Sequence, residues 1–267
     1  MKISVIGTGN MALAIIGAVA KSGRMSPTVF YTYDKFKIQT EKAVALGALS
    51  SDSLSEVLDR SEFVLLSVKP QDVNGAIDEI KAACPDFDKK IYISICAGIS
   101  SKYICEAFGC EVPVIRVMPN APMMIGAGAT AISRNSYVND KNYSKICGIF
   151  SFGGTVASIP EEHMNAIISV NSSSPAYFYE IARIMIEYAK LQGIEEKVAR
   201  FMTQGAMYGA AKMLMSSEST PDELISVVKS KKGTTEAALD SFSSNNLEKV
   251  FFEAMDACTK RAVELGK

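Results

Sequence analysis

The feature that most constrains the fold is a glycine-rich segment, GTGNMA at residues 7–12, between the short apolar run Lys2–Ile6 and the amphipathic stretch Met11–Lys21. The segment matches the pattern G-x-G-x-x-G/A at a strand-to-helix turn. Such a turn needs small residues for its tight backbone, for close approach to a pyrophosphate and for close packing of helix on strand. Amide groups at the start of the helix also favour an anion. The segment therefore predicts the first turn of a dinucleotide-binding domain.

The first half of the chain alternates short apolar runs with amphipathic stretches. Strands buried on both faces and separated by helices are typical of a parallel sheet with right-handed crossovers. We therefore expect a Rossmann-like, doubly wound α/β domain over residues 1–160. The expected strands are Lys2–Ile6, Val29–Tyr33, Phe63–Ser67, Ile91–Ser94, Val114–Val117, Ala129–Ser133 and Gly154–Ile159, and the expected helices are Met11–Lys21, Lys37–Leu46, Val73–Ala83, Ser101–Phe108 and 141–150.

From about residue 161 the apolar residues recur at three- and four-residue steps, as at Tyr177, Ile181 and Ile184. This spacing is typical of amphipathic helices, so we expect an all-helical domain over residues 161–267. It carries more apolar positions than a monomeric bundle of this length could bury, which predicts dimerisation through this domain. The expected helices are Ala176–Lys190, Glu196–Met215, Pro221–Lys229, Thr234–Ser241 and Asn246–Leu265.

Charge and composition disfavour several classes of protein. The formal net charge is −1, whereas a nucleic-acid-binding chain is expected to carry a basic excess. No segment approaches about 18 uninterrupted apolar residues, which disfavours a membrane span, and the start of the chain lacks the apolar core of a signal peptide. The six cysteines form no C-x-x-C motif and only one histidine could join them. We therefore expect reduced thiols in a cytoplasmic protein and no metal site.

The end of the second expected strand bears on the choice of cofactor. An acidic residue about 20 residues after the glycines commonly accepts the ribose hydroxyls of NAD and repels the additional phosphate of NADP. Asp34 stands near that distance and is the candidate for this contact; its alternative role is to cap the following helix. Lys35 and Lys37 are equally suited to pair with a 2′-phosphate, so the sequence leaves the choice between NADH and NADPH open.

Five further segments resemble the motifs of one enzyme family. They are SVKP at residues 67–70, SICAGI at 94–99, RVMPNAP at 116–122, SSPAY at 173–177 and GTT at 233–235. They resemble A-V-K-P, S-I-x-A-G-I, R-V-M-P-N-T-P, the end of G-S-G-P-A-Y and the end of S-P-G-G-T-T of the pyrroline-5-carboxylate reductases. The matches run from residue 2 to about residue 240 in family order and spacing. Five ordered motifs are far more specific than any one of them.

The resemblance implies an activity and an assembly. The activity is reduction of the cyclic imine 1-pyrroline-5-carboxylate to L-proline by hydride transfer from NADPH or NADH, the last step of proline biosynthesis. The assembly is a homodimer through the helical domain, with the active site at the dimer interface and with larger rings of dimers left open. A small molecule is then the substrate, and neither nucleic acid nor membrane is a partner.

The resemblance also implies the residues of the site, by position in the motifs. The pyrophosphate would be held by Gly7, Gly9, Asn10 and Met11. The ribose and nicotinamide would pack along Val68, Lys69 and Pro70, and the nicotinamide pocket would be lined by Ala97 and Asn120. The substrate would be held by Ser230, Gly233, Thr234 and Thr235. In the family, backbone amides of this last loop hold the carboxylate, and the second threonine hydroxyl meets the ring nitrogen. Thr235 is therefore the candidate catalytic residue.

The residue types at these motifs suit that reaction. Hydride attack on a protonated C=N bond needs no strong general base because the carbon is already electrophilic, so the protein mainly has to orient the reactants. Amides at a helix start suit a carboxylate, and a hydroxyl suits a nitrogen whose charge disappears during the reaction. No histidine, cysteine or metal is required.

Departures from the family pattern concern the substrate. Ser172 and Ser174 replace the glycines of G-S-G-P-A-Y, and because serine disfavours positive φ we expect a different turn there. Lys231 and Lys232 replace a Pro-Gly pair; they are either a solvated surface pair or a feature that favours a more anionic substrate.

Three alternatives follow from these departures and from the architecture. One is a reductase of a related cyclic imine, and another is a catalytically silent nucleotide-binding paralogue, which the retention of Thr235 disfavours. A β-hydroxyacid dehydrogenase is disfavoured because Lys190, Lys197 and Lys212 lack the asparagine that those enzymes have four residues after the lysine.

Overall fold

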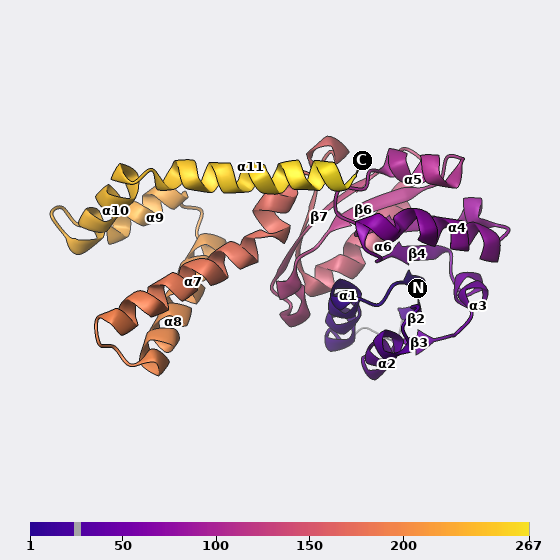
Figure 1. The fold of residues 1–267 in the computed structure, drawn as a ribbon, viewed down its shortest axis with the longest axis horizontal. Coiled ribbons are helices and arrows are strands. Elements are labelled where there is room, and N and C mark those ends of the chain that lie inside the picture. The colour runs from indigo at the N-terminus through magenta and orange to yellow at the C-terminus, as the bar shows by residue number, and fades with distance from the viewer. Residues whose placement is uncertain (24–27, 267) are drawn as a thin grey trace. The chain divides into compact units, whose positions relative to one another are not determined.

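The computed structural model describes residues 1–23 and 28–266 (Figure 1). The chain forms two compact units: one comprises Met1–Pro175 together with the end of the chain from Ala257, and the other comprises Ala176–Asp256. Residues 161–175 therefore pack with the sheet, whereas the composition of the sequence changes at residue 160. The division into domains at residue 160, which we infer from the sequence, stays a prediction.

The first unit is built on one eight-stranded sheet of order β3-β2-β1-β4-β5-β6-β7-β8 in the described residues. The strands are β1 (Lys2–Ile6), β2 (Val29–Tyr33), β3 (Leu49–Ser50), β4 (Phe63–Leu66), β5 (Ile91–Ser94), β6 (Val114–Met118), β7 (Gly128–Arg134) and β8 (Gly154–Ser158). The strands from β3 to β6 are parallel, with Ile3 beside both Phe30 and Phe63. The strand order reverses between β1 and β4, so the Rossmann-like doubly wound sheet is confirmed.

Two details of the sheet differ from the prediction. β7 runs antiparallel to β6, with Ile115 opposite Arg134, so the expectation of parallel pairing is wrong for this pair of strands; β8 is parallel to β7. The antiparallel strand β7 can return from β6 through a short connection, whereas a parallel strand needs a crossover of about a dozen residues or more.

The short strand β3 and the helix α3 (Leu54–Asp59) are absent from the prediction.

Helices cover both faces of this sheet, and β4 shows why its residues are apolar throughout. Phe63 and Leu65 join a core cluster with α1, whereas Val64 and Leu66 join a second cluster with α4. Successive side chains of a strand point to opposite faces, so a strand covered on both sides has no polar face. The helices of this unit are α1 (Asn10–Lys21), α2 (Lys37–Ala45), α3, α4 (Val73–Ala83), α5 (Ser101–Phe108) and α6 (Asp140–Phe150).

Gly98 lies where the end of the chain packs against the sheet. Its φ is +82°, and a Cβ atom at this position would stand 2.2 Å from the backbone oxygen of Ala262. Ala262 belongs to the last turns of α11 (Leu247–Leu265) and shares a small core with Met118 and Met164. The glycine of the SICAGI segment is therefore required by backbone conformation and by close contact together.

A buried ion pair ties β6 to residues after β8. The Arg116 side chain is 5% exposed, and its Nη1 lies 3.2 Å from Oε1 of Glu161. The same carboxylate accepts hydrogen bonds from the backbone N–H and the hydroxyl of Ser101, at the start of α5. Burial lowers the pKa of the Arg116 guanidinium, and the Glu161 carboxylate opposes that effect. Glu161 therefore compensates a buried positive charge and caps a helix.

Glu161→Ala is expected to lower the free energy of unfolding by about 3 kcal/mol, because it leaves the buried guanidinium of Arg116 without its counter-ion. The neighbouring Glu162 is exposed, so Glu162→Ala is the matched control and should change stability by no more than about 0.5 kcal/mol. Urea denaturation of both variants measures the difference. Equal midpoints for the two variants would contradict this account of Glu161.

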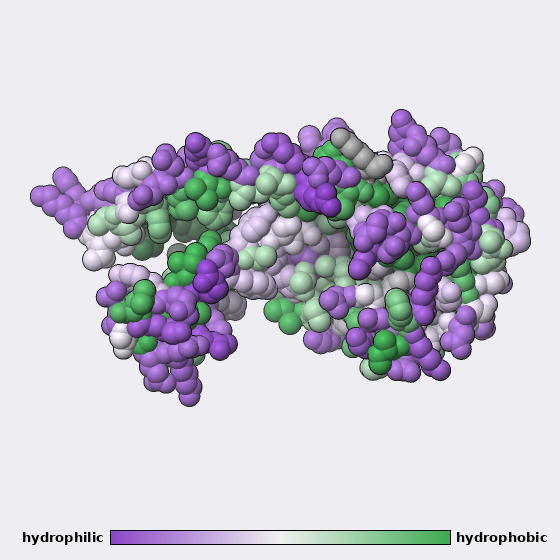
Figure 2. Space-filling view, in the orientation of Figure 1, coloured by the Kyte–Doolittle hydropathy of each residue, from purple (hydrophilic) through white to green (hydrophobic). Residues whose placement is uncertain are grey.

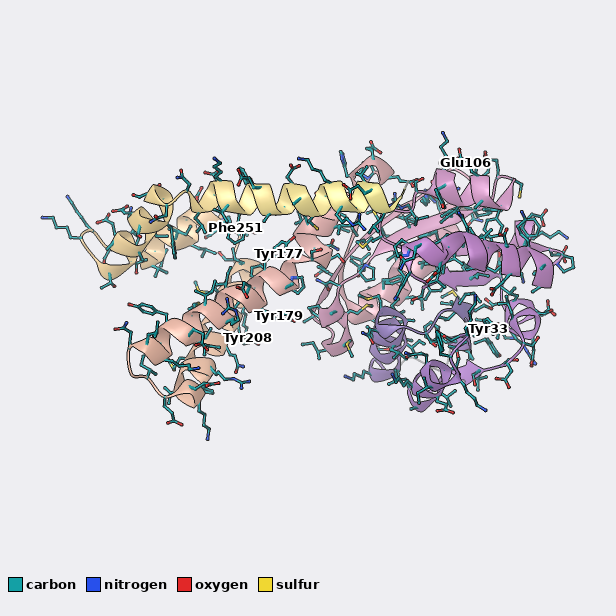
Figure 3. The ribbon with its side chains drawn as sticks, in the orientation of Figure 1. Tyr33, Glu106, Tyr177, Tyr179, Tyr208 and Phe251 are labelled. Carbon is teal, nitrogen blue, oxygen red and sulfur yellow. The ribbon has the colours of Figure 1, made fainter. Side chains whose placement is uncertain are left out.

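The second unit is all-helical, as predicted, but has almost no core of its own. It contains α7 (Ser174–Leu191) from Ala176 onward, α8 (Glu196–Ser216), α9 (Pro221–Val228), α10 (Thr234–Ser244) and the start of α11. Within α7 to α10 only Ala199 and Thr203 are buried. Large apolar side chains such as Tyr179 and Tyr208 are exposed (Figure 3), and Figure 2 shows hydrophobic residues on the surface of this unit.

Candidate active site

A cavity of about 570 Å³ lies at the carboxyl ends of β1, β2 and β4. It is lined by Ile6, Gly7, Gly9, Tyr33, Asp34, Lys35, Phe36, Gln39, Ser67, Val68, Lys69, Asp72, Ala76 and Glu79. Ligands of open α/β sheets bind outside the carboxyl ends of the strands, where the strand order reverses. The cavity therefore occupies the position expected of a dinucleotide site, and Tyr33 marks the end of β2 there (Figure 3).

The small residues of the glycine turn serve different purposes. Gly7 has φ +88°, and a Cβ atom there would lie 2.7 Å from the Ser67 backbone oxygen; its N–H donates to the Tyr33 carbonyl at 2.9 Å. Gly9 is the N-cap of α1 with φ −69° and ψ −179°, and its Cβ would meet nothing within 4 Å. Ala12 is fully buried. Fold geometry thus requires Gly7 and Ala12 to be small, whereas Gly9 leaves space open at the helix start.

The Asp34 side chain is hydrogen-bonded to this turn. Its Oδ2 accepts hydrogen bonds from the Thr8 backbone N–H at 2.7 Å and the Thr8 hydroxyl at 3.1 Å. Its Oδ1 accepts from the Phe36 N–H at 2.9 Å. The N-cap of α2 is Phe36 without a side-chain cap, so the alternative role of Asp34 as that cap is wrong. The ribose contact of Asp34 stays a prediction.

The two lysines near Asp34 differ in position. Lys35 lines the cavity, and its Nζ lies 2.7 Å from Oε1 of Glu79 on α4. The hydrogen bond that Lys35 donates to Glu79 raises the pKa of Lys35. Lys37 is exposed at the start of α2 and is not among the lining residues. Of the two candidates for a 2′-phosphate, only Lys35 is therefore at the cavity, and it is already paired.

The structure brings together half of the predicted cofactor residues around this one cavity. Gly7, Gly9, Asp34, Val68 and Lys69 line it. Asn10 and Met11 are the first residues of α1, and Pro70 begins a short 3₁₀ helix directly after Lys69. Sequence reasoning missed other lining residues, among them Phe36, Gln39, Asp72 and Glu79. Phe36 lies two residues after Asp34, and Asp72 lies two residues after Pro70. Their closeness in the sequence to predicted site residues is therefore the signal that could have identified them.

Ala97 and Asn120 lie further along the same edge, after β5 and β6. Asn120 is buried; its Nδ2 donates to the Asn171 carbonyl at 2.9 Å, and its Oδ1 accepts from the Ala129 N–H at 2.9 Å. Asn171 in turn donates to the carbonyls of Met118 and Ala129. The amide of Asn120 is therefore committed to holding the backbone around the end of β6, which favours a positioning role beside the predicted pocket.

The segment with the two substituted glycines is helical. Ile168–Ser172 form a π-helical turn that leads through Ser173 (φ −89°, ψ −25°) into α7. Ser172 and Ser174 are not among the non-glycine residues with positive φ in the described chain. Serine is therefore accommodated at both positions without strain.

The predicted substrate loop begins α10 in the second unit. Gly233 is its N-cap, and the Gly233 N–H donates to the Ser230 carbonyl at 2.9 Å. A Cβ atom on Gly233 would lie 2.2 Å from the Ser230 hydroxyl oxygen. Thr234 and Thr235 are the first two residues of the helix, so their N–H groups lack carbonyl partners within it. The loop therefore presents backbone donors and the positive end of a helix dipole, which suits a carboxylate.

Lys232 stands where the family motif named above has glycine, and its backbone conformation is one that favours glycine. Its φ is +59°, a conformation that costs roughly 1 kcal/mol for a residue with a side chain. The Lys232 N–H donates to Oε2 of Glu236 at 2.6 Å, and Lys229 pairs with the same carboxylate at 3.4 Å. This hydrogen bond from Lys232 lowers the pKa of Glu236. The substitution thus retains the backbone of a glycine turn.

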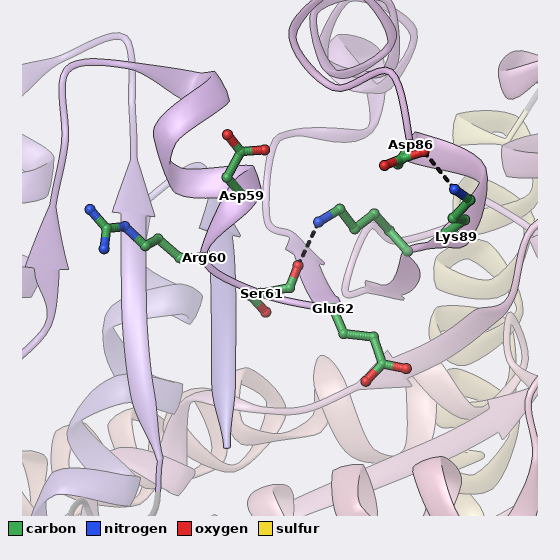
Figure 4. A pocket seen from close by; sticks show the side chains of 7 residues that line it. Asp59, Arg60, Ser61, Glu62, Asp86 and Lys89 are labelled. Atoms are coloured by element: carbon green, nitrogen blue, oxygen red, sulfur yellow. Dashed lines mark hydrogen bonds and ion pairs between the residues drawn. The ribbon is translucent and has the colours of Figure 1, made fainter.

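A second cavity, of about 340 Å³, lies before β4 and β5 at the opposite edge of the sheet (Figure 4). Lys90 donates there to the carbonyls of Leu58 and Ser61, and Lys89 pairs with Asp86 at 2.7 Å. These bonds close the end of α3 and a turn. The cavity lies at the opposite ends of the strands from the glycine turn and shares no lining residue with the cavity there.

Possible metal ligands, the cysteines and the long helices of residues 1–23 and 28–266 bear on other kinds of function. These residues hold no group of three or more His, Cys, Asp or Glu side chains that could bind a metal ion. All six cysteines are free thiols, and burial raises the pKa of Cys96 to about 11, which keeps this thiol protonated. None of the described helices is long and apolar enough to span a bilayer.

Comparisons with known proteins agree with both units. Residues 161–265 match the family model described as pyrroline-5-carboxylate reductase dimerisation, and residues 2–98 match the model described as NADP oxidoreductase, coenzyme F420-dependent. The fold and these matches define a class, the two-domain NAD(P)-dependent oxidoreductases with a helical dimerisation domain.

Individual relatives narrow that class. Pyrroline-5-carboxylate reductase from Staphylococcus aureus (strain COL) is 30% identical over 269 residues, covering 100% of this chain and 98% of its own. The enzyme of that name from Escherichia coli (strain K12) is 29% identical over 270 residues, covering 100% and 98%. A solved pyrroline-5-carboxylate reductase structure from Coxiella burnetii has a TM-score of 0.88 at 27% identity, covering 99% and 98%. The chain belongs to the pyrroline-5-carboxylate reductase family.

Proposed function

We propose that this protein reduces 1-pyrroline-5-carboxylate to L-proline with NADPH or NADH, the last step of proline biosynthesis. The observation that carries the proposal is the full-length similarity to reductases of that name, at 29–30% identity. The glycine turn with its adjoining cavity, and the donor-rich loop at the start of α10, supply groups of the kind that this reaction needs.

The residues of the first unit fit a dinucleotide. Gly9 would let a pyrophosphate approach the first N–H groups of α1, since its Cβ position is open. Val68, Lys69 and Pro70 would hold the ribose and nicotinamide along the edge after β4, and Ala97 and Asn120 would line the nicotinamide pocket. When bound, the reduced cofactor supplies the hydride that turns the C=N bond of the substrate into a CH–NH bond.

The residues of the second unit would bind the substrate. The N–H groups of Thr234 and Thr235, with Ser230 and Gly233 shaping the loop, would hold the carboxylate at the start of α10. The Thr235 hydroxyl oxygen would accept a hydrogen bond from the protonated ring nitrogen. The C=N electron pair moves onto that nitrogen during reduction, so a neutral acceptor suits both states of the group.

We further propose a homodimer formed through the helical unit, with dimers able to assemble into rings, and a cytoplasmic location. The exposed apolar side chains of α7 and α8 support association. Six free thiols are typical of a reducing compartment.

The test is NADPH and NADH oxidation by the purified protein with 1-pyrroline-5-carboxylate, followed at the nicotinamide absorbance. Thr235→Ala should lower kcat/KM by roughly 10- to 100-fold, since a hydrogen bond to a charged group contributes about 1.5–3 kcal/mol. Thr235→Ser keeps the hydroxyl and should retain most of the activity.

Each negative result has a distinct meaning. Cofactor binding without turnover of this substrate would overturn the proposal. Turnover of a related cyclic imine with a second carboxylate would instead favour the alternative that Lys231 and Lys232 suggest, and silence with every imine would favour a non-catalytic paralogue.

A further inference from the structure

The Asp34 carboxylate lines the cofactor cavity directly after the end of β2. Three donors hold it: the N–H and hydroxyl of Thr8 on Oδ2 and the N–H of Phe36 on Oδ1. A carboxylate has about four acceptor positions. The remaining one, on Oδ1, can accept from a ribose hydroxyl, which has a proton to donate. A phosphate dianion has only acceptor oxygens and cannot make this bond.

The other charges of the cavity reinforce this difference. Its lining carries three carboxylates, Asp34, Asp72 and Glu79, against two ammonium groups, Lys35 and Lys69. Lys35 is already paired with Glu79 at 2.7 Å. Among the lining residues in the described chain none is arginine, the side chain that most often binds a phosphate through two parallel hydrogen bonds.

We propose that this reductase discriminates against the 2′-phosphate and prefers NADH to NADPH, with Asp34 as the discriminating residue and the Lys35–Glu79 pair as the reason that the charge of Lys35, the lysine next to Asp34, is already compensated. This inference deepens the proposed function and rests on it for the identity of the cofactor. A 2′-phosphate would bring a charge of about −1.5 to −2 beside Asp34. Lys35 already shares its charge with Glu79, so it offers less attraction to such a phosphate than an unpaired ammonium group would.

The test measures binding of NADH and of NADPH to the full-length protein by nicotinamide fluorescence, without substrate. The dissociation constant for NADH is expected to be at least about tenfold lower than that for NADPH, the factor that corresponds to one lost hydrogen bond to a charged group. Equal dissociation constants, or tighter binding of NADPH, would overturn the inference.

Two variants and a control identify the residues responsible. Asp34→Asn keeps an acceptor for Thr8 and removes the charge, and Glu79→Gln releases Lys35 without touching the glycine turn. Each is expected to reduce the NADH-to-NADPH preference at least threefold. Glu41→Gln removes one negative charge from the exposed surface of α2 and should leave the preference unchanged. If Asp34→Asn fails to fold, Glu79→Gln carries the test, and an unchanged preference in it would overturn the inference.

Failure of the inference and failure of the proposed function give different results. Tight NADH binding without reduction of 1-pyrroline-5-carboxylate would overturn the function and leave the cofactor preference standing. Reduction of 1-pyrroline-5-carboxylate by an enzyme that binds NADPH more tightly would do the reverse.

Discussion

Gly9→Val is expected to raise the dissociation constant for the nicotinamide cofactor about 100-fold or more while leaving the fold intact. The open space beyond the Gly9 Cβ position is where a pyrophosphate would reach the first N–H groups of α1. The Cβ atom of a valine there would meet no protein atom within 4 Å, and its side chain would occupy space that the pyrophosphate needs. A 100-fold loss corresponds to about 2.7 kcal/mol of binding free energy. Nicotinamide fluorescence gives the dissociation constant, and thermal unfolding reports the fold.

Two other glycine variants make this expectation specific. In Gly7→Ala the new Cβ would approach the Ser67 oxygen to 2.7 Å at φ +88°, so stability and cofactor binding should fall together. Gly148→Ala, on the exposed surface of α6, should leave binding unchanged and stabilise the helix by about 0.5–1 kcal/mol. If Gly9→Val bound cofactor as the wild type does, the glycine turn would not be the pyrophosphate site.

Much of the fold could be predicted because β1, β2 and β5 are apolar runs bounded by clear turns. The bounds of these three strands agree with the prediction. The two-residue strand β3 has no periodicity to detect, since a pattern of alternation needs about four residues. The reversal at β7 was detectable: residues 119–127 are too few for a crossover helix, which excludes a parallel return from β6.

The candidate site could be predicted only in part, for a physical reason. Gly7 and Gly9 follow from the backbone demands of one local turn, which a sequence displays directly. The hydrogen bonds of Asp34 to Thr8 and of Asn120 to Asn171 join segments 26 and 51 residues apart, and no local pattern encodes such partners. The same holds for Glu79, which reaches Lys35 from α4. Residue types indicated the chemistry, whereas tertiary packing decides which groups remain available.

Phe201→Glu is expected to convert the protein from a dimer to a monomer and to abolish its activity. Phe201, Tyr208 and Met215 recur every seven residues along α8 and so share one face, and they are 74%, 70% and 82% exposed in the single chain. Within α7 to α10 only Ala199 and Thr203 are buried. Because this unit buries so little apolar surface alone, its stability should come from a second copy.

A glutamate at the centre of such an interface would be a buried charge without a partner, which destabilises an assembly by about 3–5 kcal/mol. That is a loss of roughly 100-fold or more in the dimer association constant. Light scattering after size exclusion measures the mass of the particle. Lys141→Gln on α6 changes the net charge by the same single unit at an exposed position and should remain dimeric and active. A Phe201→Glu protein that stayed dimeric would show that this face of α8 does not form the interface, and association would then have to involve the other exposed apolar residues of α7 and α11.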